Sequence, residues 1–89
     1  MEKIKEAVSQ YVDKNINVVI GHEKLSVEQI QQIKAVSTSI VAEREKILCG
    51  GSFSMAINNN DFEKIISCAD PLCLRALKLF LFVKLYVKF

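Results

Sequence analysis

The C-terminal segment, residues 71–89, constrains the fold most, because its sequence PLCLRALKLFLFVKLYVKF is apolar on nearly every side. Read as a helix, it has one inward stripe made of Leu72, Ala76, Leu79, Phe80, Val83 and Val87. Further apolar residues then lie on the other side among lysines, namely Leu77, Leu81, Phe82 and Leu85. A helix of this kind has two surfaces to bury, so we predict that one of them meets a second molecule.

The same segment also fits a strand from Leu77 onward. Every odd-numbered position from 77 to 89 is apolar, and every lysine there has an even number. The aromatic and β-branched content favours a strand. Asp70-Pro71 favours a helix at the start, since Asp suits the cap and Pro the first helical position. We predict a helix, with a C-terminal strand as the alternative.

Three more helices are predicted upstream, from apolar periodicity and capping residues. Residues 2–14 have apolar positions at helical spacing. Ser26 and Gln29 form a capping box that begins a helix over 27–48, with Ile47 and Leu48 inward and Gly50-Gly51 as its left-handed stop. Residues 61–69 form a shorter helix, for which Asn60 is the expected cap. Its inward positions are Phe62, Ile65, Ile66 and Ala69.

The predicted fold is therefore all-α, a small helical domain of about four helices over 2–14, 27–48, 61–69 and 71 onward. The alternative is α+β with a C-terminal strand. Two stretches are ambiguous: 16–20 reads as a short strand or a buried connector, and 52–57 as a strand or one helical turn. No repeat, low-complexity tract or linker divides the chain, so residues 1–89 are expected to form a single domain without an internal boundary.

The string Phe53-Ser-Met-Ala-Ile-Asn-Asn-Asn-Asp-Phe-Glu-Lys-Ile-Ile, followed by Ala69-Asp70-Pro71, resembles part of an ankyrin repeat. The resemblance covers 19 of the 89 residues and lacks the TPLH opening of that family. Ankyrin repeats also form solenoids of several stacked units, for which this chain is too short. What the resemblance implies is therefore limited to a helical conformation for 53–57.

Composition and charge distribution both indicate an interaction partner. Apolar residues make up 51% of a chain that is small enough to have limited interior volume. The net charge is +2, but residues 1–63 carry seven basic against nine acidic residues, while residues 64–89 carry five against one. The net charge of +2 excludes a strongly basic nucleic-acid arm and a strongly acidic tail. The dipolar distribution suits antiparallel pairing with a second copy or binding to an acidic partner.

Enzymatic chemistry is not predicted. His22 is the lone histidine, and Cys49, Cys68 and Cys73 have neither a partner motif nor zinc-ligand spacing. Gly50-Gly51 lacks the spacing of a phosphate-binding loop. We therefore expect no catalytic residue, no metal site and no cofactor. The charged N-terminus has no apolar signal region, so the three thiols are expected to be reduced and the protein cytoplasmic.

The sequence thus favours a non-enzymatic protein-protein interaction or regulatory protein, acting through its apolar, basic C-terminal segment on a protein partner, as a homodimer, or both. The predicted partner-binding residues are Leu77, Leu79, Leu81, Phe82, Leu85 and Tyr86. The predicted basic contacts are Arg75, Lys78, Lys84 and Lys88. A membrane-surface-binding small protein is the first alternative, because aromatic residues and lysines alternate here. A small DNA-binding transcriptional regulator is the second, although leucines stand where base-reading polar side chains belong.

Overall fold

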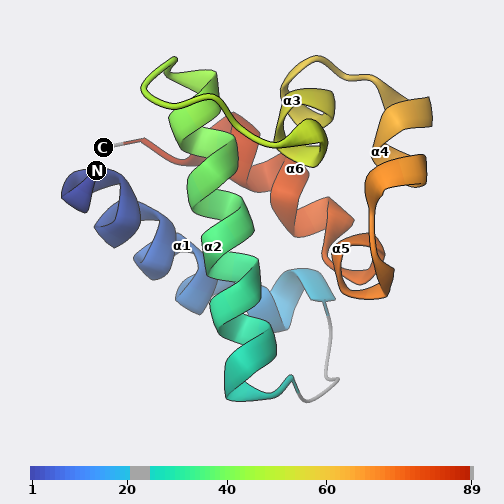
Figure 1. Ribbon diagram of the computed structural model, residues 1–89. Coiled ribbons are helices and arrows are strands. Elements are labelled where there is room, and N and C mark those ends of the chain that lie inside the picture. Colours follow the sequence, from blue (N-terminus) through green and yellow to red (C-terminus); the bar gives the residue numbers. More distant parts are fainter. Residues whose placement is uncertain (21–24, 89) are drawn as a thin grey trace.

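The computed structural model describes residues 1–20 and 25–88, and these contain six helices and no strand. They are α1 (Glu2–Ile20), α2 (Val27–Arg44), α3 (Ser52–Asn58), α4 (Phe62–Cys68), α5 (Pro71–Arg75) and α6 (Leu77–Tyr86) (Figure 1). The all-α prediction is confirmed, and the C-terminal strand is wrong, because residues 77–86 are helical. Six helices replace the expected four, since 52–58 forms one and the C-terminal segment divides at Ala76.

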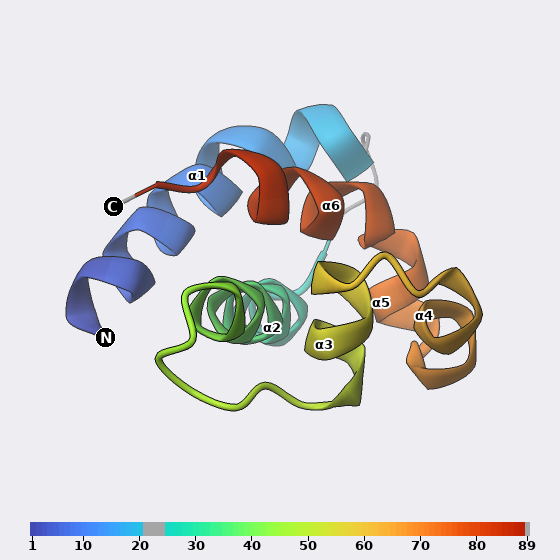
Figure 2. The same cartoon turned by 90° about the horizontal axis from the view of Figure 1, so that it is seen from above.

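The helices form two layers, which Figure 2 shows from above. α1 and α6 lie side by side in one layer, and both pack on α2, which lies in the other layer beside α3. α4 follows α3 at the edge of the molecule, and α5 leads back to α6. The last helix therefore packs on helices from three earlier parts of the sequence, α1, α2 and α3.

α1 is longer than predicted, because its buried stripe continues beyond residue 14. Ile4, Val8, Val12 and Ile16 are all buried at intervals of four residues. Asn15 does not end the helix: its side-chain amide donates to the Tyr11 carbonyl at 2.8 Å within the helix. The predicted strand or connector at 16–20 is therefore wrong. His22, the lone histidine of the sequence, lies outside the described residues.

α2 begins as predicted and ends earlier. The Ser26 hydroxyl accepts a hydrogen bond from the Gln29 amide at 3.1 Å, and the Gln29 side chain accepts one from the Ser26 amide at 2.9 Å. The helix stops at Arg44, because Lys46 adopts a left-handed conformation with φ of 60°. Gly50-Gly51 is therefore not its stop, and the predicted inward residues Ile47 and Leu48 are exposed.

The cap of α4 and most of its expected inner face differ from the prediction. The Asp61 carboxylate, rather than Asn60, accepts from the amide of Lys64 at 3.3 Å. Of the four residues predicted to face inward, only Ile65 is buried, and Phe62 and Ile66 are exposed. α4 packs mainly on α3, and Ile65 is the residue of α4 that is buried in the core. The Asp70 cap of α5 is confirmed, with the Cys73 amide 2.8 Å from the carboxylate.

The inner face of α6 completes the hydrophobic core. Leu79, Phe80 and Val83 are fully buried, together with Ile33, Ile40 and Val41 of α2. The ring of Phe80 packs edge-to-face on Phe53 of α3, with centroids 5.6 Å apart. The C-terminal segment is thus a structural part of its own chain, and only its outer face is open to a partner.

Candidate protein-binding surface

The structure divides the predicted partner-binding residues between the inside and the outside of the molecule. Leu79 is fully buried, so its assignment as a partner contact is wrong. Leu77 and Leu81 are partly buried against the core. Leu85 and Tyr86 are exposed, at 58% and 59% of their surface. The division follows from the helical period, which places odd-numbered residues on different sides rather than on one strand face.

Four residues form the outward surface of α6, and we call Lys78, Phe82, Leu85 and Tyr86 the α6 face. Their spacings of three and four residues place them on one side of the helix. The Phe82 and Tyr86 rings meet edge-to-face with centroids 5.7 Å apart, and the Lys78 ammonium lies 5.8 Å from the Phe82 centroid. These contacts order a cation and two aromatic rings into a continuous row.

The α6 face extends towards α1 through Tyr86. A hollow of about 260 Å³ lies between the two helices, bordered by Ala7, Gln10, Tyr11, Lys14, Tyr86, Val87 and Lys88. Burial raises the pKa of the Tyr11 hydroxyl, and the nearby Tyr86 hydroxyl raises it further. Two tyrosines therefore border this hollow, with lysines at its rim.

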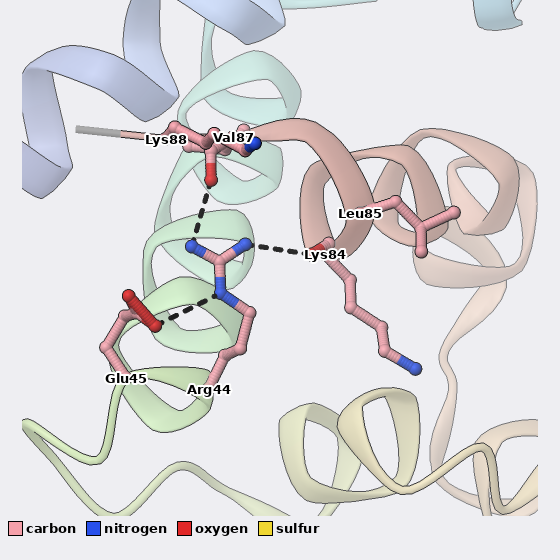
Figure 3. A pocket seen from close by; sticks show the side chains of 6 residues that line it. All are labelled: Arg44, Glu45, Lys84, Leu85, Val87 and Lys88. Carbon is pink, nitrogen blue, oxygen red and sulfur yellow. Dashed lines mark hydrogen bonds and ion pairs between the residues drawn. The ribbon is translucent and has the colours of Figure 1, made fainter.

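On the other side of α6, Arg44 holds the end of the helix in place. Its guanidinium donates to the carbonyls of Lys84 at 2.8 Å and Val87 at 2.9 Å. Its Nε lies 3.6 Å from the Glu45 carboxylate. Figure 3 shows this arrangement beside a hollow of about 520 Å³, with Leu85 pointing away from the guanidinium. Arg44 thus fixes the C-terminal end of α6 through both terminal nitrogens of its guanidinium.

Sequence reasoning missed Arg44, because the carbonyls it contacts lie 40 and 43 residues later in the chain. The predicted basic contacts do not form a single cluster. Lys78 and Lys88 are exposed, while the Lys84 ammonium donates to the Asn60 side chain at 2.6 Å. Arg75 belongs to α5. Lys78 and Lys88 are therefore the basic residues of this segment that are exposed on α6 and just beyond its end.

The three cysteines lie in different surroundings. Cys49 and Cys68 are exposed, and Cys73 is buried. Burial, together with the neighbouring Asp70 carboxylate, raises the pKa of the Cys73 thiol to about 11. This thiol is therefore protonated at neutral pH and is a weak nucleophile. Within residues 1–20 and 25–88, no three His, Cys, Asp or Glu side chains gather where they could hold a metal ion.

The candidate site is thus an exposed helix face of mixed aromatic, aliphatic and basic character, on a helix whose inner side is buried in the core. None of the helices in the described part of the chain has the length and apolar content to cross a membrane. No family model, curated protein or solved structure matches this chain.

Proposed function

We propose that this chain is a non-enzymatic protein-binding module whose contact surface is the α6 face. The observation that supports the proposal is the exposure of Leu85 and Tyr86 on a helix whose opposite side is fully buried. Enclosing large apolar side chains of this kind in an interface contributes about 1.5–3 kcal/mol each before entropy costs. Aromatic anchors of this type are typical of the residues that dominate binding energy.

The α6 face is also well ordered before binding. Phe80 and Val83 fix the inner side of the helix in the core, and Arg44 fixes its C-terminal carbonyls. A partner therefore meets a preformed surface, and little conformational entropy is lost when the complex forms. The exposed Lys78 and Lys88 favour a partner with acidic groups around an apolar centre.

An anionic membrane surface is the alternative that the same face suggests, because lysines and aromatic rings also occur together in interfacial helices. We favour a protein partner because the exposed apolar part of α6 is short: Leu85 and Tyr86 are its exposed large apolar residues, with Phe82 half-buried. Helices that lie on membranes combine an apolar face with a strongly polar opposite face, whereas the opposite side of α6 is buried in the core.

The test compares the native chain with a Leu85→Ser/Tyr86→Ser variant, using lysine cross-linking in an extract of the source cells. We expect mass spectrometry to find cross-links from Lys78 and Lys88 to a partner, and the variant to lose them. Val27→Ser is the matched control, because Val27 is an exposed apolar residue of α2 outside the α6 face. Far-UV circular dichroism confirms that each variant is folded.

Two results would contradict the proposal. One is the absence of any protein, copies of the chain included, cross-linked to the α6 lysines of the native chain. The other is sedimentation of the chain with phosphatidylserine vesicles, lost in the Leu85→Ser/Tyr86→Ser variant, without protein cross-links. The second result would assign the α6 face to a membrane surface.

A further inference from the structure

A second exposed apolar surface lies on α4. Phe62 is 64% exposed and Ile66 is 58% exposed. The two residues are one helical turn apart, and Glu63 lies three residues before Ile66, so it neighbours Ile66 on the helix surface. We call Phe62, Glu63 and Ile66 the α4 face. It has the same form as the α6 face, a pair of large apolar residues on a short helix with charged neighbours.

The two faces carry opposite charge. Residues 61–70, which contain α4 and the caps on either side of it, have three acidic residues against Lys64. Lys64 is two positions from both Phe62 and Ile66, so it lies away from the α4 face. Residues 77–88, which contain α6, have three lysines and no acidic residue. An acidic apolar face and a basic apolar face therefore occur on the same chain.

Within one molecule, the α4 face and the α6 face are too far apart to contact each other. α4 lies at the edge of the molecule, beyond α3, whereas α6 lies beside α1 in the other layer (Figure 2). The exposed sides of Ile66 and Leu85 are both open in this arrangement. Any contact between the two faces must therefore join different molecules.

We propose that the α6 face of one copy binds the α4 face of a second copy. This inference rests on the proposed function and names its partner as the chain itself. Phe62 and Ile66 pack against Leu85 and Tyr86, and Glu63 lies near the lysines of the other copy. Such a contact joins unlike surfaces, so each copy retains one free face unless the assembly closes on itself.

The experiment exchanges the charges of the two faces. The first variant, Lys78→Glu/Lys88→Glu, makes the α6 face acidic, and the second, Glu63→Lys, makes the α4 face basic. Size-exclusion chromatography with light scattering measures association of the 89-residue chain at low ionic strength over a range of concentrations. We expect the native chain to associate and each variant alone to bind itself about tenfold more weakly, because like charges then meet.

An equimolar mixture of the two variants provides the decisive measurement. The native α6 face of the second variant then meets the native α4 face of the first, and the acidic α6 face of the first meets the basic α4 face of the second. Association is therefore expected to be restored in the mixture. Glu6→Lys is the matched control, since it makes the same charge change on α1, outside both faces. This control retains both native faces, so by itself it is expected to associate as the native chain does. Phe62→Ser provides an uncharged variant that weakens the same contact.

Several outcomes would overturn the inference. A native chain that stays monomeric while its α6 lysines cross-link to another protein leaves the proposed function intact and excludes the second copy. Association of the native chain without restoration in the mixture means that copies meet through other surfaces. Binding to phosphatidylserine vesicles alone contradicts both the inference and the proposed function.

Discussion

At the scale of single residues, Gly50 allows a close polar contact between α2 and α3. The Ser54 hydroxyl donates to the Ser39 hydroxyl at 2.9 Å. The side-chain amide of Asn58 donates to the Ile40 carbonyl at 3.0 Å and also to the Glu43 carboxylate. A Cβ atom added at Gly50 would lie 2.9 Å from the Cβ atoms of both Glu43 and Ser54. Glycine is therefore required here for space.

We expect Gly50→Ala to lower the free energy of unfolding by about 1–3 kcal/mol, because the added methyl group forces the two helices apart. Gly51→Ala is the matched control, since a Cβ atom there meets nothing within 4 Å. Its effect should stay within about 0.5 kcal/mol. Urea denaturation of both variants measures the difference. Equal destabilisation by the two substitutions would show that Gly50 has no packing role.

The raised pKa of Cys73 predicts its reactivity. The thiolate is the form that reacts with iodoacetamide, and for Cys73 it appears only as the pH approaches 11. At pH 8 we expect Cys73 to be alkylated at least about tenfold more slowly than the exposed Cys49 and Cys68, through burial and protonation together. Its rate should still rise above pH 10.

Mass spectrometry of the alkylated peptides measures the three rates separately. Unfolding in urea should make the three cysteines react at similar rates, since both the burial and the Asp70 contact are then lost. Rapid alkylation of Cys73 in the folded chain at pH 8 would contradict the assigned burial.

At the scale of helices, α2 and α3 end in the same way. In each, the residue after the cap has a positive φ, 60° at Lys46 and 58° at Asn60. The next amide bonds back to the helix, from Ile47 to the Ala42 carbonyl at 2.9 Å and from Asp61 to the Ala56 carbonyl at 3.0 Å. This is the Schellman arrangement, in which glycine is the most favourable residue at the left-handed position.

Lys46→Gly should therefore stabilise the fold by up to about 1 kcal/mol, because lysine is strained in the left-handed region and glycine is not. Asn60→Gly should gain less, since asparagine tolerates that conformation better than lysine does and Asn60 also accepts a hydrogen bond from Lys84. Thermal unfolding followed by circular dichroism ranks the two variants. A lower melting temperature for Lys46→Gly than for the native chain would contradict the conformational argument.

These helix ends show what the sequence could predict. The start of α2 was predictable, because the Ser26–Gln29 capping box uses residues three positions apart. Its end was not, because the left-handed residue is a lysine while two glycines follow nearby. The inner face of α4 was wrong for a different reason: the spacing of Phe62 and Ile66 is identical whether a helix side faces the core or the solvent.

At the scale of the whole molecule, the excess of apolar residues in the C-terminal segment was apparent from sequence, but its division between core and surface was not. Leu79 and Leu85 are the same residue type on the same helix, and one is fully buried while the other is exposed. Their difference depends on where α1, α2 and α3 lie around α6. The exposed members of the predicted set, Leu85 and Tyr86, and the missed α4 face both follow from that arrangement.

The packing of α6 also predicts that the chain cannot fold without it. Truncation after residue 76 removes Leu79, Phe80, Val83 and Val87, whose burial contributes on the order of 6–12 kcal/mol before entropy costs. A domain of this size has a total stability of about 5–15 kcal/mol, so the shortened chain should lose its cooperative thermal transition. Leu85→Ser/Tyr86→Ser, which changes only the outer side of the same helix, should melt within a few degrees of the native chain. Circular dichroism compares the three proteins.

A truncated chain that melts cooperatively near the native temperature would contradict this prediction, because α6 would then be a separable tail. The α6 face would in that case not be held in place by burial of the inner side of the helix.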